Sequence, residues 1–209
     1  MGEIRKEYRD GLKLPLVEQF YTIQGEGFHA GKPAYFIRIG GCDIGCHWCD
    51  TKLSWRADLH PLVDIADIRN EVDRTAAKSI VVTGGEPSSY NLDPLCSSLK
   101  ELNVKTFLET AGTGEFTGIW DWICLSPKKH NQPTDVFYNK ANELKVIVFK
   151  QEDIEWAEEA SKYVNEDCLL YLQPEWSKYE QMIPMIVDYV KNNPKWNISL
   201  QAHKFMHIP

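Results

Sequence analysis

Three cysteine residues lie close together in one short stretch of the sequence. Cys42, Cys46 and Cys49 are spaced by four and three positions and follow the apolar run 34–39, which predicts a strand. Thiolates select zinc, copper(I) or iron–sulfur clusters. Because a four-iron cluster normally takes four cysteines, three of them leave either a fourth ligand elsewhere or one iron open to a small molecule. The spacing therefore predicts a metal centre at a strand end, with chemistry at an open iron.

Other interpretations of these cysteines stay open at this stage. Structural zinc usually takes two Cys-x2-Cys pairs, whereas Cys96, Cys124 and Cys168 stand alone. His47 completes a zinc ligand set on paper, but it lies between two of the cysteines, where a short loop has difficulty presenting four groups tetrahedrally. Three unrelated buried thiols are a further alternative. Disulfides are disfavoured, because nothing in the sequence indicates secretion into an oxidising compartment.

Two glycine-containing segments also follow predicted strands. The segment 83–87, Thr-Gly-Gly-Glu-Pro, comes directly after the apolar run 79–82. The alternating run that begins at Val17 breaks into Gly-Glu-Gly at residues 25–27, a composition that favours a turn and lets backbone approach a ligand. A hairpin-like connection into the strand 34–39 is the purely structural interpretation of that turn.

Strand-like and helix-like segments alternate along the rest of the chain. Apolar residues at helical spacing, such as Ile65, Ile68 and Val72, predict amphipathic helices between short β-branched runs. The predicted strands are 34–39, 79–83, 105–109, 122–126, 143–149, 168–173 and 197–202. The predicted helices are 64–77, 92–102, 153–164 and 177–192, with a short helical turn at 116–120.

This alternation predicts an α/β fold with a mainly parallel sheet and right-handed crossovers. Sites on such sheets form beyond the carboxyl ends of the strands. The cysteine loop and the segments 83–86, 109–110, 126–128 and 173–174 all follow strand ends, so we expect one mouth to collect them. About seven strands do not fill an eight-unit barrel. We therefore predict a partial (β/α) TIM-like barrel with about six core parallel strands and fewer helices than a full barrel.

The composition is that of one globular domain. The chain has 209 residues, of which 43% are hydrophobic and 25% charged, so we expect a single domain over residues 1–209 with residues 1–13 as a flexible arm. A net charge of −7 argues against a surface that coats nucleic acid. The apolar runs are shorter than the ~20 residues of a membrane span, and the charged N-terminus does not resemble a signal peptide. We expect a cytoplasmic protein that binds neither nucleic acid nor membrane.

The cysteine loop and the segment 83–87 together resemble the radical S-adenosylmethionine superfamily. Its signature is Cys-x3-Cys-x2-Cys with an aromatic residue before the third cysteine, which is Trp48 here, and its glycine-rich segment meets the methionyl amino group. Further segments resemble the 7-carboxy-7-deazaguanine synthases within that superfamily: 21–27, 36–38, 48–52, 126–128, 172–174 and 200–209. The matching segments run from about Glu18 to the final residue.

The resemblance implies a specific reaction. It implies conversion of 6-carboxy-5,6,7,8-tetrahydropterin to 7-carboxy-7-deazaguanine with release of ammonia, a ring contraction in queuosine and related deazapurine biosynthesis. The implied cofactors are a 4Fe-4S cluster, S-adenosylmethionine and Mg²⁺. In the resembled family, one-electron cleavage of S-adenosylmethionine gives a 5′-deoxyadenosyl radical that takes the C6 hydrogen of the pterin and later returns it. The implied partners are the pterin, an electron donor such as flavodoxin, and a second copy of the chain in a homodimer.

The resemblance also implies the site residues. Cys42, Cys46 and Cys49 would hold the cluster, and Thr51 would ligate magnesium. The implied cofactor contacts are Trp48, Cys49, Asp50, Gly85, Ser126, Pro127, Lys128 and Gln173. The implied substrate contacts are Ile23, Gln24, Gly25, Arg38, Thr83 and Pro209. Arg38 suits a pterin carboxylate because guanidinium binds carboxylate in bidentate fashion, although an isolated strand arginine is more often a surface or ion-paired residue.

The end of the chain is expected to fold back over the mouth. The predicted strand 197–202 points its carboxyl end there, and residues 203–209 span about 25 Å when extended. Apolar Phe205, Met206 and Ile208 favour a packed tail over a frayed one. We therefore expect the α-carboxylate of Pro209 to reach the substrate site. Three further residues are expected at the mouth, each with a structural hydrogen bond as its alternative role: Glu26, Glu109 and His203.

Two alternative functions stay open. A glycyl-radical-enzyme activase shares both motifs but must admit a protein loop to its site. A non-catalytic iron–sulfur electron carrier coordinates its cluster fully and has no use for the segment 83–87. Turnover of S-adenosylmethionine would exclude the carrier, and turnover of the pterin without a partner protein would exclude the activase.

Overall fold

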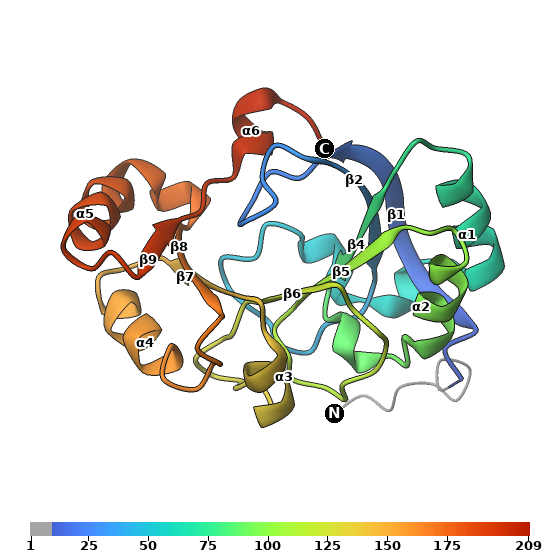
Figure 1. The fold of residues 1–209 in the computed structure, drawn as a ribbon, viewed down its shortest axis with the longest axis horizontal. Helices are drawn as coiled ribbons and strands as arrows, with labels where there is room; N and C mark the ends of the chain where they lie inside the picture. The colour runs from blue at the N-terminus through green and yellow to red at the C-terminus, as the bar shows by residue number, and fades with distance from the viewer. Residues whose placement is uncertain (1–9) are drawn as a thin grey trace.

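The structure is a computed structural model that describes residues 10–209, and a curved nine-stranded sheet runs through this part of the chain (Figure 1). The sheet order is β3-β1-β2-β4-β5-β6-β7-β8-β9. The strands are β1 (Lys13–Ile23), β2 (Pro33–Ile39), β3 (Leu62–Asp64), β4 (Ser79–Gly84), β5 (Lys105–Thr110), β6 (Trp122–Leu125), β7 (Glu143–Val148), β8 (Leu169–Pro174) and β9 (Trp196–Ile198).

The strand directions confirm the predicted partial barrel. β2 pairs in parallel with β4, and the parallel pairing continues through β5, β6, β7 and β8 to the short β9. β1 is antiparallel to β2, and β3 is antiparallel to β1. Because β3 and β9 are the two edges of the sheet, the barrel is open on one side.

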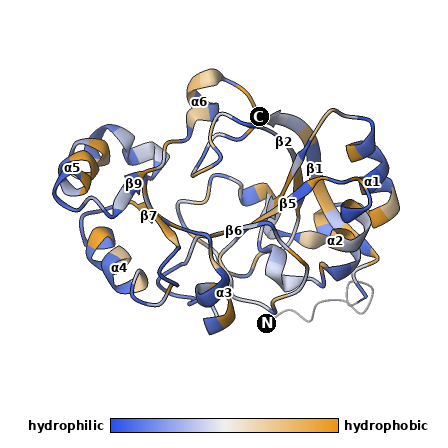
Figure 2. Ribbon diagram, in the orientation of Figure 1, coloured by the Kyte–Doolittle hydropathy of each residue, from blue (hydrophilic) through white to orange (hydrophobic). Residues whose placement is uncertain are grey.

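Helices cover the outer face of the sheet (Figure 1). They are α1 (Ile65–Asp73), α2 (Asp93–Lys100), α3 (Asp135–Lys140), α4 (Glu152–Ala160) and α5 (Tyr179–Asn192), whereas α6 (Ala202–Met206) lies apart from them near the C-terminus. Hydrophobic and hydrophilic residues share each of the longer helices (Figure 2). In α2, for example, Leu95, Cys96 and Leu99 are buried, and full burial of such a leucine contributes about 1.5–3 kcal/mol.

The strands alternate between an apolar outer face in the main core and an inner face that carries both polar and apolar residues. In β7, Leu144 and Val146 are fully buried in the main core, whereas Lys145 and Ile147 line a central cavity. β2 follows the same rule, with Ile37 in the core and Arg38 at the cavity. Successive side chains of a strand point to opposite faces, so the residues between the core positions face the barrel interior, and Lys145 and Arg38 are among them.

The connection between β1 and β2 packs against the inner side of the sheet. The His29 ring stacks on Phe107 with centroids 4.3 Å apart, and Phe28 stacks on Trp122 at 4.7 Å. Glu143 accepts hydrogen bonds from the Phe28 backbone N–H at 3.1 Å and from Trp122 Nε1 at 3.2 Å. A Cβ on the residue before Phe28, Gly27, would lie 2.0 Å from the Glu143 carboxylate. Gly27 also has a φ of 64°, which L side chains rarely adopt, so glycine is favoured where this loop turns into the barrel.

Several predicted elements differ from those observed. Residues 116–120 form no helix, because the Gly118 N–H binds the Asp93 carboxylate and Gly118 has a φ of 85°. The last strand ends at Ile198 rather than at residue 202, since the chain leaves the sheet there and α6 begins at Ala202. β3 and α3 were not predicted. Of the predicted arm 1–13, residues 1–9 lie outside the described residues, and β1 begins at Lys13.

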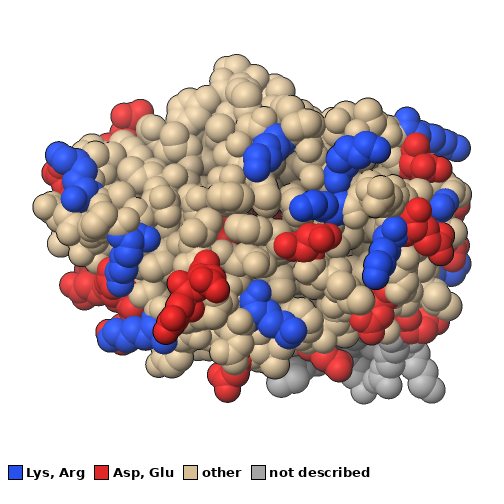
Figure 3. All heavy atoms as spheres, in the orientation of Figure 1, with Lys and Arg blue, Asp and Glu red and all other residues tan. Residues whose placement is uncertain are grey.

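The apolar character of the helices and the distribution of surface charge both bear on function. Across residues 10–209, none of the helices has both the length and the apolar character that crossing a bilayer requires. On the face seen in Figure 3, basic and acidic side chains are interspersed rather than gathered into a patch of one sign.

Candidate functional site

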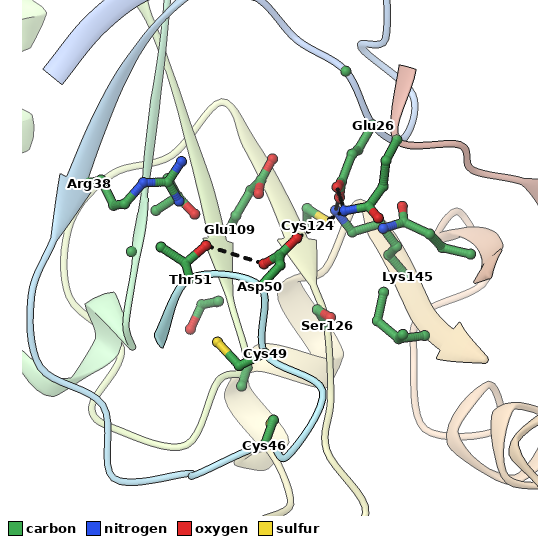
Figure 4. A pocket seen from close by; sticks show the side chains of 18 of the residues that line it. Glu26, Arg38, Cys46, Cys49, Asp50, Thr51, Glu109, Cys124, Ser126 and Lys145 are labelled. Atoms are coloured by element: carbon green, nitrogen blue, oxygen red, sulfur yellow. Dashed lines mark hydrogen bonds and ion pairs between the residues drawn. The ribbon is translucent and has the colours of Figure 1, made fainter. Parts of the chain in front are cut away.

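A cavity of about 280 Å³ opens inside the curved sheet and is lined mainly from the carboxyl ends of the parallel strands. It collects every residue predicted for the site except Pro127: Ile23, Gln24, Gly25, Arg38, Cys42, Cys46, Trp48, Cys49, Asp50, Thr51, Thr83, Gly85, Ser126, Lys128, Gln173 and Pro209. Glu26, Glu109 and His203 also line it. Figure 4 shows ten of the lining residues by name, projecting from several strands and loops toward one space. The expected single mouth is therefore present.

The three cysteines of the loop lie together on one side of the cavity. Cys46 is buried with Ile44 and Ala111, and Cys42, Trp48 and Cys49 pack against that group. A turn closed by the Cys49 N–H and the Cys46 carbonyl oxygen, 3.0 Å apart, brings two of the thiols onto the same side. Burial raises the pKa of the Cys42 and Cys46 thiols, so binding of a metal at neutral pH displaces their protons.

This donor set fits an iron–sulfur cluster with three protein ligands. All three donors are soft thiols, the class that clusters require. The exposed His47 turns to the ring of Phe149, 5.1 Å away, and is not among the residues that line the cavity. Within residues 10–209, no three His, Cys, Asp or Glu side chains converge on the position of a single metal ion. The geometry thus gives the zinc alternative no support.

The Gly-Gly segment after β4 approaches the end of β2 closely. The Gly85 N–H binds the Ile39 carbonyl oxygen at 2.8 Å, and the Glu86 N–H binds the Gly41 carbonyl oxygen at 2.8 Å. A Cβ on Gly85 would stand 2.2 Å from the Gly41 oxygen, and Gly84 has a φ of 138°, a conformation that L side chains rarely adopt. Only glycines permit this contact, which fixes the β4 loop against the start of the cysteine loop.

The Glu86 carboxylate extends that connection to the next strand. Glu86 is 1% exposed and accepts hydrogen bonds from the Ser88 N–H at 2.9 Å, the Ala111 N–H at 2.7 Å and the Thr110 hydroxyl. A buried carboxylate is tolerated when such donors satisfy it. Sequence reasoning placed Glu86 in a motif but assigned it no role, and the structure gives it the role of joining the loops after β4 and β5.

Lys128 and its neighbours form the wall beside the cysteine loop. Its ammonium donates to the carbonyl oxygen and hydroxyl of Ser126 at 2.6 and 2.7 Å and lies 5.4 Å from the centre of the Trp48 ring. Burial lowers the pKa of Lys128. Gln173 also reaches the cavity, with its carbonyl oxygen bound by the Ser199 hydroxyl at 2.6 Å. Pro127 does not line the cavity.

The neighbouring strand β7 carries an ion pair that the sequence analysis did not foresee. Lys145 Nζ lies 2.5 Å from Glu26 Oε2, and the Lys145 side chain is 5% exposed. Burial by itself lowers the pKa of Lys145, but the carboxylates of Glu26, Glu109 and Glu143 raise it, and the result is well above the ordinary value. Burial likewise raises the pKa of Glu26, yet Lys145 and a hydrogen bond from Gln201 bring it below the ordinary value. Both groups are therefore charged at neutral pH.

The sequence does contain a signal for this pair. Lys145 stands between Leu144 and Val146 in a run predicted as a buried strand. A lysine inside such a run indicates that one face of the strand is polar. Recognising its partner required the fold, because Glu26 lies 119 positions away in the sequence.

Arg38 and Gln24 line another part of the cavity, and each binds an acidic side chain. Arg38 Nε donates to Glu18 at 2.7 Å, so Arg38 is ion-paired and lines the cavity at the same time. Gln24 Nε2 donates to Glu109 at 2.8 Å, and its carbonyl oxygen accepts the Glu26 N–H at 3.1 Å. These contacts hold the end of β1 against the end of β5.

The C-terminal segment covers the open side of the barrel. α6 ends at Met206, and the capping residue His207 adopts a left-handed conformation with a φ of 55°. The Ile208 N–H then binds the His203 carbonyl oxygen at 3.2 Å, and Pro209 lines the cavity. The chain thus returns to the mouth through a helix and a capping turn, rather than from the end of a longer strand.

The chain is similar to known proteins both in sequence and in structure. The Radical SAM superfamily model matches residues 36–121. The chain is 54% identical over 207 residues to the 7-carboxy-7-deazaguanine synthase of Flavobacterium psychrophilum, covering 99% of this chain and 98% of that protein. It is 41% identical to the synthase of the same name from Synechocystis sp., covering 94% of both chains. The crystal structure of QueE from Escherichia coli superposes with a TM-score of 0.84 at 28% identity, covering 97% of this chain and 100% of that chain.

Substitution of the cysteines tests the ligand assignment. Anaerobic reconstitution of the unaltered protein is expected to give about four irons per chain. Cys42→Ala, Cys46→Ala and Cys49→Ala are each expected to lose the cluster, measured as bound iron and sulfide, because each removes one of three thiol ligands. Cys96→Ala and Cys168→Ala serve as controls, since both thiols are buried away from the cavity. Loss of iron from either control would show that the ligands are misassigned.

Proposed function

Because the chain belongs to the 7-carboxy-7-deazaguanine synthase family of the radical S-adenosylmethionine superfamily, we propose that it converts 6-carboxy-5,6,7,8-tetrahydropterin to 7-carboxy-7-deazaguanine with release of ammonia. It is a radical S-adenosylmethionine lyase of queuosine biosynthesis. The observation that carries the proposal is one cavity, lined at once by three loop cysteines and by the polar residues that the family resemblance assigns to cofactor and substrate.

Membership of the superfamily implies a 4Fe-4S cluster and S-adenosylmethionine. Cys42, Cys46 and Cys49 would hold the cluster, and Trp48, Asp50, Gly85, Ser126, Lys128 and Gln173 would line the space for the bound S-adenosylmethionine. When bound, the reduced cluster and S-adenosylmethionine supply a radical able to abstract a hydrogen atom from the substrate. The residues of this chain position the reactants and exclude water from the cavity.

The substrate would occupy the side of the cavity away from the cysteines. Ile23, Gln24 and Gly25 at the end of β1 line the cavity together with Arg38, Thr83 and Pro209, and these are the contacts that the family resemblance assigns to the substrate. The Arg38 guanidinium is oriented by Glu18 through Nε. Its terminal nitrogens suit bidentate recognition of the pterin carboxylate. Lys145 and Glu26 hold fixed opposite charges within the same cavity.

We assign Mg²⁺ to the neighbourhood of Thr51. Its hydroxyl donates to Asp50 Oδ1 at 3.2 Å, and the side chain lines the cavity (Figure 4). Mg²⁺ keeps several waters and takes few protein ligands. One hydroxyl supplemented by substrate oxygens is therefore a chemically adequate site.

The proposal includes an electron donor such as flavodoxin and a homodimer as the working assembly. Reduction of the cluster requires an external one-electron donor, and the family resemblance supports both partners. The six cysteines are free thiols, which supports a reducing compartment such as the cytoplasm. The activase and electron-carrier alternatives are not favoured, because relatives matched along nearly the whole chain are named synthases.

An anaerobic turnover assay tests the function. The reconstituted enzyme, given a reductant, S-adenosylmethionine, Mg²⁺ and the pterin, is expected to form 7-carboxy-7-deazaguanine and ammonia in equal amounts, measured by chromatography and an ammonia assay. The product should form without any partner protein substrate. Cleavage of S-adenosylmethionine with no conversion of the pterin would contradict the proposal.

Replacement of Thr51 tests the magnesium site. Thr51→Ala is expected to remove most of the Mg²⁺ stimulation of turnover while leaving the iron content unchanged, because the hydroxyl ligand is lost and the cysteines are untouched. Thr51→Ser keeps the hydroxyl and is the matched control that should retain the stimulation. The measurement is the initial rate over a Mg²⁺ titration, and an unaltered response in Thr51→Ala would remove Thr51 from the site.

A further inference from the structure

The short segment from Ser199 to Lys204, here called the C-terminal bridge, contacts the loop after β1 at three points. The Ser199 hydroxyl accepts the Gly27 N–H at 2.9 Å. The Ala202 N–H donates to the Gly25 carbonyl oxygen at 2.9 Å, and Gln201 Nε2 donates to Glu26 Oε1 at 2.9 Å. The loop that carries the expected substrate contacts is therefore held in place from the far end of the chain.

The same bridge also contacts the cysteine loop, at Asp50. Gln201 Nε2 donates to Asp50 Oδ2 at 3.1 Å, and Lys204 Nζ donates to that oxygen at 3.0 Å. Lys204 Nζ also donates to Oε1 of the Gln201 side-chain amide at 3.0 Å. Asp50 is one of the expected cofactor contacts and directly follows the last cysteine. Gln201 is thus bonded to the cofactor side and to the substrate side of the cavity at once.

The chemistry of these neighbours determines the orientation of the Gln201 amide. The carboxylates of Glu26 and Asp50 only accept hydrogen bonds, and the Lys204 ammonium only donates them. The two N–H groups must therefore face the carboxylates, and the carbonyl oxygen must face Lys204. With Gln201 8% exposed, water cannot readily replace these partners. A neutral group with two donors on one atom is what separates two carboxylates at this point.

The resulting chain of contacts has a lysine at each end, a carboxylate next to each lysine and the neutral Gln201 amide in the middle. Lys145 binds Glu26, Glu26 binds Gln201, Gln201 binds Asp50, and Asp50 binds Lys204. Each carboxylate has a lysine partner of its own, and the Gln201 amide nitrogen is the donor that the two share. If the Gln201 amide moves away from one carboxylate, its hydrogen bond to the other carboxylate also changes in length and angle.

We propose that Gln201 is a positioning residue that couples the two ligands, so that binding of S-adenosylmethionine raises the affinity for the pterin and the reverse. This inference rests on the proposed function. A ligand that orders the loop at Asp50 also orders Gln201 and Glu26, which lowers the ordering cost for the ligand on the other side. Thermodynamic linkage makes the effect reciprocal.

The test is anaerobic calorimetry on the cluster-loaded full chain without reductant, so that no turnover occurs. The dissociation constant of S-adenosylmethionine is measured with and without saturating pterin. We expect the pterin to lower it about fivefold or more in the unaltered protein. In Gln201→Leu the ratio should fall below about twofold, because the amide that joins the two carboxylates is lost, although Glu26 keeps Lys145 and Asp50 keeps Lys204. Gln201→Glu places a third carboxylate between the two and should also abolish the coupling.

Two controls separate positioning from general damage. Gln181→Leu alters an exposed glutamine on α5 and should keep the coupling of the unaltered protein. A purely structural loss in Gln201→Leu would weaken both ligands and leave the ratio of dissociation constants intact, so an unaltered ratio overturns the inference. A ratio of one in the unaltered protein also overturns it, while the proposed function stands. Failure of the unaltered protein to bind the pterin at all would overturn both.

Discussion

The rest of the site depends on the hydrogen bonds that the buried residue Glu86 makes with its backbone and its side chain. Its backbone N–H holds the Gly41 carbonyl oxygen at the start of the cysteine loop, and its side chain holds Ala111 and Thr110 at the end of β5. Glu86, in the loop after β4, thus connects the ends of β2, β4 and β5. Parallel strands bring their carboxyl ends to one edge, but only such cross-connections convert three flexible loops into a wall of fixed shape.

An open barrel also needs a cover, and here the loop after β1 and the C-terminal bridge supply it. The loop after β1 enters the barrel interior with Phe28 and His29 against the sheet. The bridge at the C-terminus then fastens that loop to the cysteine loop through Gln201. The reacting space is consequently enclosed by segments that are far apart in sequence. Enclosure matters for radical chemistry, because an exposed radical reacts with whatever it meets.

Much of this arrangement was predictable from local patterns, and the rest was not. The strand–helix alternation and the position of each motif after a strand indicated the partial barrel and the shared mouth. The connection from Lys145 to Glu26 and the bridge at Gln201 depend on contacts between residues more than 100 positions apart, which no local pattern encodes. The end of β9 was mispredicted because strand propensity alone does not register that the chain turns after Ser199, whose hydroxyl binds the Gly27 N–H and whose backbone N–H makes a last bond to β8.

The most direct test of this account is the affinity of Glu86→Gln for S-adenosylmethionine. Glutamine keeps the size of the side chain, but its amide nitrogen cannot accept a hydrogen bond, so at least one buried donor at Ser88, Ala111 or Thr110 loses its partner at a cost of about 1–3 kcal/mol. Calorimetry on the cluster-loaded variant should show an affinity about tenfold weaker, with far-ultraviolet circular dichroism unchanged. Glu115→Gln, at an exposed position in the following loop, should bind normally. An affinity of Glu86→Gln within about twofold of the unaltered protein would contradict the account.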